Sequence, residues 1–154
     1  MEKLLLSNQE NNRSVNFRAA TAPQLPPVLV GDERRFKQVL INLVKNALKF
    51  TTWGSITIAS SYDKEEEMLI VQVIDTGAGI DSKDLGKLFN KFGKLKRTST
   101  MNDEGIGLGL TIVKNIVELS EGKVQVYSKG IGKGSYFCFS LKLRQEATTQ
   151  SINS

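Results

Sequence analysis

The feature that most constrains the fold is an apolar stripe along residues 33–51. Apolar side chains recur there at helical spacing, and Asp32 is a suitable N-cap for a helix that begins after it. A helix with one apolar face must bury that face against another layer of the protein. The stripe consists of Phe36, Val39, Leu40, Leu43, Val44 and Ala47.

Segments typical of strands lie on both sides of this helix. Alternating apolar residues predict a first strand over 14–21, and the prolines that follow it exclude a helix there. Two further pairs of segments read as hairpins, the first around a charged turn at 63–67 and the second around a turn at 129–134. In the first hairpin, one strand is expected to begin at Ile56 and the other to cover 68–74. In the second hairpin, the strands are expected to cover 124–126 and 136–143.

The rest of the chain adds two helices and defines the domain limits. A short helix is expected over 82–89, and a longer one opens within 105–110 and ends with Gly122 as its C-cap. Helices on one face of a mixed, mostly antiparallel sheet form a two-layer α/β sandwich of the α+β class. Residues 15–143 are predicted to form the domain, 1–14 the tail of an upstream region, and 144–154 a disordered C-terminal tail.

The amino-acid composition excludes several kinds of chemistry. The 154 residues contain no histidine, which rules out the usual serine and cysteine triads, histidine zinc sites and histidine general bases. Cys138 is the single cysteine, so no internal disulfide can form. Any chemistry must use carboxylates, amides, lysines, backbone amides and a metal held by oxygen ligands.

The net charge of +5 does not by itself indicate a nucleic-acid interface. The chain has no dense block of lysine and arginine interleaved with aromatic residues, which make up only 7% of it. No apolar run approaches the length of a membrane span. We therefore expect no nucleic acid partner, no membrane contact by this domain and a cytoplasmic location.

Three polar side chains share one strip of the long helix. Asn42, Asn46 and Lys49 stand at positions i, i+4 and i+7, at the border of the apolar stripe. Asparagine is a poor residue for a helix interior because its amide competes with the backbone. From this helix alone, a polar site and a solvated edge are equally good interpretations.

A second constellation follows the apolar strand 68–74. Asp75 stands at the exit of that strand, where a partly buried carboxylate needs a hydrogen-bond donor such as an adenine amino group. Gly77 and Gly79 would allow a flat ring to approach the backbone. A tight turn would explain the two glycines but not the acid.

A third constellation is the alternating run Gly105-Ile106-Gly107-Leu108-Gly109-Leu110. Free amides at the start of a helix form a cradle for phosphate groups. The run follows a polar loop, where a dinucleotide-binding fingerprint requires a strand. The chain also lacks a P-loop and the motifs of Ser/Thr/Tyr protein kinases.

Taken together, these motifs resemble the ATP-binding catalytic domain of sensor histidine kinases. That domain belongs to the gyrase, chaperone, histidine kinase and MutL ATPase superfamily, which has the Bergerat fold. The resemblance extends from Val15 to Leu143. It rests on an N box at 32–51, a G1 box at 75–80, an F box at 88–92, a G2 box at 105–110 and a last glycine motif at 132–137.

The resemblance implies roles for individual residues. Asp75 would accept a hydrogen bond from the adenine amino group, with Ser135 assisting through water, and Asn46 would ligate Mg²⁺. Asn42, Asn46 and Lys49 would be the catalytic residues, and residues 93–104 would form an ATP lid. Phe89 and Phe92 would anchor the lid, with plain core packing an equally good interpretation for both. The residues expected to bind Mg-ATP are Asn42, Asn46, Lys49, Asp75, Gly77, Gly79, Ile80, Lys94, Gly105, Gly107, Leu108, Gly109, Leu110 and Ser135.

The resemblance also implies a reaction and partners. The domain would bind ATP or ADP and donate the γ-phosphoryl group to a histidine on the dimerisation domain of its parent kinase, which is free to carry a membrane anchor. The phosphoryl group would then pass to a receiver domain. Two alternatives stay open: a nucleotide-binding regulatory module without transfer, and an ATP hydrolase. Hydrolases of the superfamily carry a glutamate where this chain has Asn42, and an amide cannot act as that base.

Overall fold

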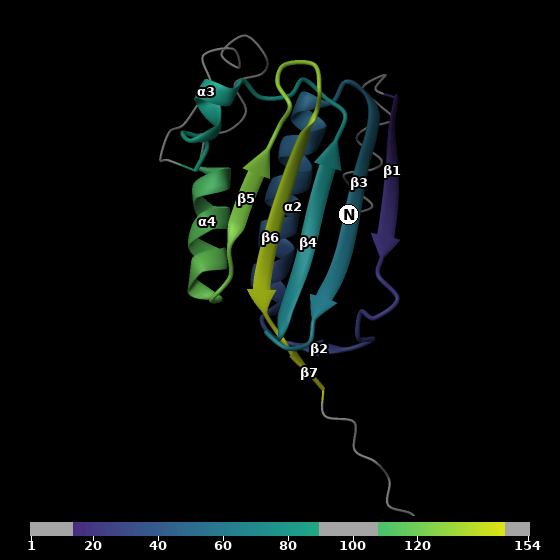
Figure 1. Cartoon of the computed structure of the whole chain (residues 1–154), viewed down its shortest axis with the longest axis vertical. Coiled ribbons are helices and arrows are strands. Elements are labelled where there is room, and N and C mark those ends of the chain that lie inside the picture. Colours follow the sequence, from purple (N-terminus) through teal and green to yellow (C-terminus); the bar gives the residue numbers. More distant parts are fainter. Residues whose placement is uncertain (1–13, 90–107, 147–154) are drawn as a thin grey trace, which may run out of the picture.

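The computed structural model describes residues 14–89 and 108–146. Seven strands and three helices form in these two ranges (Figure 1). In chain order they are β1 (Ser14–Thr21), β2 (Leu29–Val30), α2 (Glu33–Phe50), β3 (Trp53–Asp63), β4 (Met68–Asp75), α3 (Ser82–Leu85), α4 (Gly109–Leu119), β5 (Val124–Tyr127), β6 (Ser135–Lys142) and β7 (Arg144–Gln145).

Five strands form one mixed sheet in the order β1-β3-β4-β6-β5. Strand β1 is parallel to β3, and the other three pairs are antiparallel. Helices α2 and α4 pack on one face of this sheet, as Figure 1 shows. The predicted α+β sandwich with a mostly antiparallel sheet is therefore confirmed.

Helix α2 buries the predicted apolar stripe. Its start is capped by Asp32, whose Oδ1 accepts a hydrogen bond from the Arg35 amide at 3.0 Å. The Phe36 ring lies 6.4 Å from the ring of Phe139 on β6, measured between centroids. Full burial of one aliphatic side chain contributes roughly 1.5–3 kcal/mol. The buried residues of α2 are Val39, Leu43, Val44, Ala47 and Leu48.

The register of β4 and β6 decides which side chains meet under the helices. Val71 pairs with Phe139 and Val73 pairs with Phe137, and all four side chains are buried. Because side chains alternate between the two faces of a strand, the pair two residues further on lies on the same face. That pair is Asp75 and Ser135. The sheet register thus brings a carboxylate and a hydroxyl together on the buried face.

The C-terminal end of α4 differs from the prediction, which made Gly122 the C-cap. The helix ends at Leu119, and Ser120 is the C-cap. Glu121 adopts a left-handed conformation with φ of 54° and donates to the Glu118 carbonyl, while Gly122 donates to Val117. These two bonds form a Schellman motif with glutamate where glycine is usual. A Cβ on Gly122 would lie 1.8 Å from the Ser140 carbonyl oxygen, so contact with β6 requires that glycine.

Other boundaries also differ from those predicted, most of them by a single residue. The first hairpin begins earlier, at Trp53, and α3 is shorter, ending at Leu85. Residues 144–145 were expected in a disordered tail, but they form β7 and pair with β2. The predicted upstream tail lies outside the described residues except for Ser14, which begins β1.

Candidate functional site

The buried carboxylate of Asp75 lies where β4 leaves the sheet. Its residue is only 5% exposed. Oδ1 accepts a hydrogen bond from the Gly77 amide at 2.8 Å, and Oδ2 accepts one from the Ser135 hydroxyl on β6. The expected burial of this acid with donors around it is therefore found. The resemblance implied that Ser135 acts through water, whereas here its hydroxyl contacts the carboxylate directly.

Two glycines let backbone segments meet on either side of Asp75. A Cβ on Gly77 would lie 2.2 Å from the carbonyl oxygen of Phe50, the last residue of α2. Gly79 has a φ of +68°, and a Cβ there would lie 2.1 Å from the Gly130 carbonyl oxygen. The turn that follows β4 is therefore held between the end of α2 and the loop joining β5 to β6. Backbone packing at this turn therefore requires both glycines.

Two residues at this end of the molecule escaped the sequence reasoning. The first is Ser128, whose hydroxyl accepts a hydrogen bond from the amide of Ile80 at 3.0 Å. Ile80 itself is a predicted site residue, and it is buried. Thr51 is the second. Thr51 is fully buried, and its Oγ1 has no hydrogen-bond partner within the described ranges. The signals available were weak: a serine after a strand and a threonine after a helix are common.

Asn42 and the start of α4 lie together. An ideal Cβ on Gly109 would be 3.4 Å from Asn42 Oδ1, so the helix start and this amide are in contact. The Asn42 Nδ2 donates to the Gln38 carbonyl at 3.0 Å, which leaves the amide oxygen on the side of α4. Leu108 is the N-cap and provides no side-chain cap bond for the first turn, which contains Leu110. Uncapped amides at a helix start are suited to binding an anion.

Asn46 and Lys49 lie on α2 between Asn42 and the Asp75 turn. Both side chains are half-buried, as expected for residues at the border of the apolar stripe. The Lys49 Nζ is 5.8 Å from the centroid of the Phe50 ring, a cation–π distance. The predicted site residues Lys94, Gly105 and Gly107 lie outside the described residues, as do Phe92 and the predicted lid, 93–104.

The amide oxygens on α2 are the type of donor that a hard metal ion takes. Within residues 14–89 and 108–146, no three His, Cys, Asp or Glu side chains gather into a metal cage. The amide oxygen of asparagine is a hard ligand, and Asn46 is a half-buried residue one helical turn after Asn42. Mg²⁺ keeps several waters and takes few protein ligands when substrate phosphates supply the rest. The residues present therefore fit Mg²⁺ that is bound largely through phosphate oxygens.

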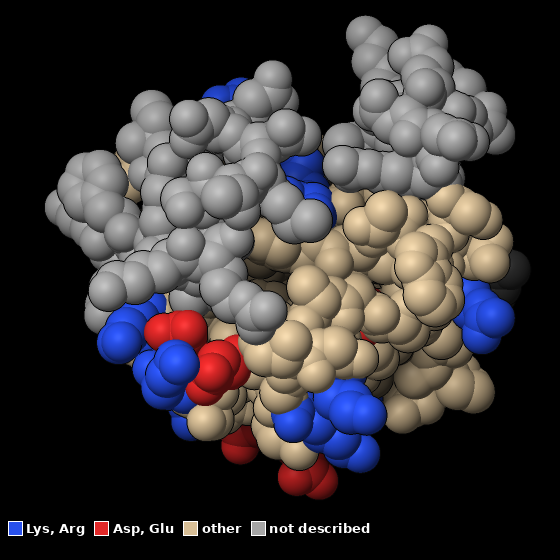
Figure 2. Space-filling model, turned by 90° about the horizontal axis from the view of Figure 1, so that it is seen from above, with Lys and Arg blue, Asp and Glu red and all other residues tan. Residues whose placement is uncertain are grey.

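Uncharged residues make up much of the visible surface at the end of the molecule that carries this turn (Figure 2). Figure 2 looks onto that end, and uncharged residues fill the middle of the visible surface. Lysine and arginine side chains, with a few acids, lie around it. An uncharged centre with basic groups nearby suits a ligand with an aromatic ring and anionic groups.

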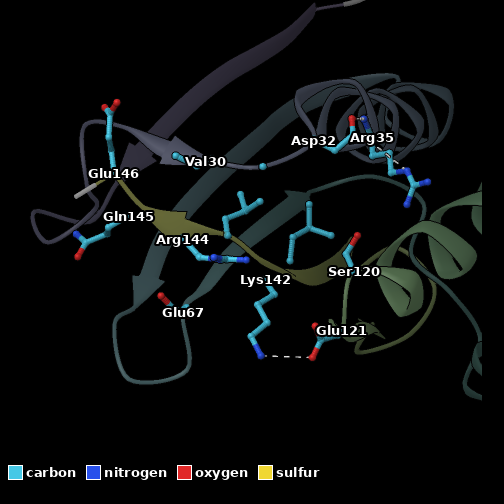
Figure 3. A pocket seen from close by; sticks show the side chains of 13 residues that line it. Val30, Asp32, Arg35, Glu67, Ser120, Glu121, Lys142, Arg144, Gln145 and Glu146 are labelled. Carbon is cyan, nitrogen blue, oxygen red and sulfur yellow. Dashed lines mark hydrogen bonds and ion pairs between the residues drawn. The ribbon is translucent and has the colours of Figure 1, made fainter. Parts of the chain in front are cut away.

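A cavity of about 870 Å³ lies at the opposite end, beside β2 and β7 (Figure 3). Its walls carry both signs of charge, including the ion pairs Lys142–Glu121 at 3.3 Å and Arg35–Asp32 at 3.3 Å. None of the predicted site residues lines it. A smaller cavity of about 460 Å³ adjoins Asn42, between the outer faces of α2 and α4.

In residues 14–89 and 108–146, every helix is too short or too polar to cross a bilayer.

Comparison with known proteins gives sequence relatives among sensor kinases. The chain is 44% identical over 117 residues to the autoinducer 2 sensor kinase/phosphatase LuxQ of Vibrio harveyi, a match that covers 73% of the chain and 14% of that protein. LuxQ of Vibrio vulnificus is 39% identical over 137 residues, covering 86% and 16%. The chain thus spans about one seventh of the length of these relatives.

Solved structures agree in fold. Full-length ShkA, crystallised with AMPPNP, matches with a TM-score of 0.76 and 27% identity over 93% of this chain and 28% of that one. The nucleotide-free catalytic domain of the histidine kinase ThkA matches with a TM-score of 0.70 and 29% identity, covering 90% and 86%. The family model for histidine kinase-, DNA gyrase B- and HSP90-like ATPases matches residues 31–145. The chain belongs to this family of ATP-binding domains, and its relatives place it in the histidine kinase branch.

Proposed function

We propose that this domain binds Mg-ATP and donates the γ-phosphoryl group to a histidine on another domain of its parent kinase. The observation that carries the proposal is the buried Asp75 carboxylate, held by the Gly77 amide and the Ser135 hydroxyl. A carboxylate in this setting is an acceptor with fixed direction. The Asp75 carboxylate accepts a hydrogen bond from the adenine amino group, and Gly77, Gly79 and Ile80 line the adenine ring.

The phosphates extend from the adenine along α2 towards α4. Asn42 and the start of α4, with Leu108, Gly109 and Leu110, bind the outer phosphates, and Lys49 neutralises part of their charge; the N-cap Leu108 has no side-chain bond to the first turn. Lys94, Gly105 and Gly107 belong to the same site by their place in the motifs. Asn46 ligates Mg²⁺, which supplies charge neutralisation at the phosphate oxygens.

Transfer needs positioning rather than a base from this domain. The P–O bond to the ADP leaving group breaks as a P–N bond forms with the acceptor imidazole. Asn42, Asn46 and Lys49 orient the phosphates and offset the charge that develops on them. Asn42 occupies the position of the water-activating glutamate of related hydrolases, and an amide cannot take a proton from water. The domain should therefore hydrolyse ATP very slowly.

The proposed partners follow from the reaction. The acceptor is the histidine-bearing dimerisation domain of the parent, and a receiver domain takes the phosphoryl group next. LuxQ, a sensor kinase/phosphatase by name, is a relative of this chain, and this supports the assignment. We place the domain in the cytoplasm, where ATP is available, without membrane contact of its own, in a parent that is free to carry a membrane anchor.

Nucleotide binding is tested by calorimetry on the 154-residue chain. ADP with Mg²⁺ should bind more tightly than GDP with Mg²⁺. Asp75→Asn should weaken ADP binding by roughly 1.5–3 kcal/mol, because the carboxylate loses its charge and gains a donor that faces the adenine amino group. Equal ADP affinity for the wild type and Asp75→Asn would refute the adenine assignment.

Phosphoryl transfer is tested with γ-labelled ATP. The chain alone should gain no acid-labile phosphate, because it has no histidine. Mixed with the parent's histidine-bearing domain, it should label that domain in trans, weakly, since a covalent connection normally raises the effective concentration. Demonstrated ATP binding without any label on the partner histidine would favour a regulatory module. Rapid steady-state hydrolysis by the chain alone would favour an ATP hydrolase.

A further inference from the structure

The turn that carries the proposed adenine site is held from two sides by backbone bonds. On the side of α2, the Ala78 amide donates to the Phe50 carbonyl at 2.9 Å. On the side of the β5–β6 loop, Gly132 donates to the Ala78 carbonyl at 2.7 Å, and Gly134 donates to the Gly77 carbonyl at 3.1 Å. The second side is a loop of glycines and exposed residues. Another interaction must therefore hold the conformation of this loop.

The Ser128 hydroxyl holds the conformation of this loop. It accepts hydrogen bonds from the Ile80 amide at 3.0 Å and from the Gly130 amide at 3.2 Å, and it donates to the Gly134 carbonyl at 2.7 Å. A hydroxyl has one hydrogen and two lone pairs, so these three bonds use its full capacity. The Gly130 carbonyl, at 3.3 Å, is the more distant acceptor for the same hydrogen. One side chain thus ties the adenine turn to both ends of the loop.

These bonds fix the groups that would contact the ring. Ile80 ends the turn that begins at Asp75, and Gly134 directly precedes Ser135, whose hydroxyl bonds to the Asp75 carboxylate. A Cβ on Gly134 would lie 2.1 Å from the Asp75 carbonyl oxygen, so the two segments are in direct contact. Movement of the loop would therefore move both the carboxylate and its donor.

We propose that Ser128 is a positioning residue of the adenine site, acting through Ile80 and Gly134 without touching the nucleotide. Ser128 lies outside both the G1 box and the last glycine motif. The resemblance to the family therefore implies no role for it. The proposal rests on the proposed function, because it assumes that adenine binds beside Asp75. Its consequence is that the choice of adenine over guanine depends on a hydroxyl that contacts neither base.

The test compares three variants of the full chain by calorimetry with Mg-ADP and Mg-GDP. Ser128→Ala should weaken ADP binding roughly tenfold, the equivalent of one hydrogen bond, and should reduce the preference for ADP over GDP. Ser128→Thr keeps the hydroxyl and should recover both. Ser140→Ala is the matched control, because the Ser140 hydroxyl also accepts a backbone hydrogen bond, from the Lys123 amide at 3.0 Å on the same hairpin. It should leave affinity and preference unchanged.

Unfolding by urea separates positioning from stability. A purely structural role would make Ser128→Ala and Ser140→Ala lose affinity for both nucleotides in proportion to their loss of stability, with the preference for ADP over GDP unchanged. That result would overturn the proposal. Wild-type affinity and preference in Ser128→Ala would overturn it too. Failure of the wild type to bind ADP would remove the proposed function itself, and this inference with it.

A measurement on the wild type covers the case in which Ser128→Ala does not fold. The Ile80 amide should be protected from hydrogen exchange before nucleotide is added, because its bond to Ser128 exists in the nucleotide-free chain. Free exchange of that amide in the absence of nucleotide would contradict the proposal.

Discussion

The Ser135 hydroxyl donates a hydrogen bond to the Asp75 carboxylate across the neighbouring strands β6 and β4. The two residues are directly opposite in the antiparallel register, on the face that the helices cover. With the Gly77 amide on the other oxygen, the carboxylate has its direction set before any ligand arrives. The proposed adenine acceptor is therefore a preorganised group of the sheet itself.

Removal of the Ser135 hydroxyl should change the free energy of unfolding more than it changes the affinity for ADP. Ser135→Ala leaves a buried carboxylate with one donor fewer, which should lower the free energy of unfolding by roughly 1.5–3 kcal/mol. Its effect on ADP affinity should be smaller than that of Asp75→Asn, because the acceptor stays charged. Urea unfolding and calorimetry measure the two quantities, and Ser135→Thr is the control that keeps the hydroxyl. An affinity loss larger than that of Asp75→Asn would contradict this ranking.

A methyl group at position 79 should disrupt the turn. In Gly79→Ala the Cβ would meet the Gly130 carbonyl oxygen at 2.1 Å, and the φ of +68° is unfavourable for alanine. We expect a loss of at least about 2 kcal/mol in unfolding free energy, together with weaker ADP binding. Gly86→Ala is the matched control, since Gly86 has a φ of −68° and nothing within 4 Å of an added Cβ. Equal stability of the two variants would show that the turn can relax.

The sequence predicted the layers because their patterns are local. The stripe on α2 and the alternation in β4 each require burial on one side, and Asp75 at the end of a strand was bound to be enclosed with donors. The role of Ser128 was not predictable, since its bonds to Ile80 and Gly134 depend on how two distant loops meet. Thr51 is a similar case: its hydroxyl, which has no hydrogen-bond partner among the described residues, lies against Gly77 from a distant part of the chain.

The two wrong boundaries at the C-terminal side have separate causes. Gly122 suggested a C-cap because glycine is common after helices, but Glu121 takes the left-handed position and Gly122 makes room for the Ser140 carbonyl. Residues 144–145 are polar and exposed, so nothing in their composition indicates a strand. Their order comes from pairing with β2, more than a hundred residues earlier in the chain.

Glu121 offers a route to a more stable domain. Its φ of 54° costs an L-residue roughly 1–2 kcal/mol, and glycine avoids this cost. Glu121→Gly should therefore raise the free energy of unfolding by about 1 kcal/mol, after the loss of the exposed ion pair with Lys142 and the greater freedom of the unfolded chain. Glu121→Gln removes the charge alone and should change stability little. A Glu121→Gly variant that unfolds more easily than Glu121→Gln would contradict the assignment of strain.

Tyr62 should make the fold sensitive to alkaline pH. Its side chain is buried, and its hydroxyl donates to the Leu143 carbonyl at 2.7 Å. Burial raises the pKa of Tyr62 above its usual 10, and the nearby carboxylates of Glu67 and Asp63 add to the rise. A phenol whose pKa is higher in the folded state favours folding while it is protonated. That contribution is complete below pH 10 and is lost as the pH rises through the folded-state pKa.

Tyr62→Phe separates this titration from the hydrogen bond. At pH 8 the variant should be less stable than the wild type by roughly 1 kcal/mol, because the Leu143 carbonyl loses its donor. Above pH 10 the gap should narrow, since only the wild type releases a phenolic proton on unfolding. Urea unfolding from pH 8 to pH 11.5 measures the gap, and Tyr127→Phe is the control, because Tyr127 is 57% exposed. A gap that stays constant over this range would show that Tyr62 does not control the alkaline limit.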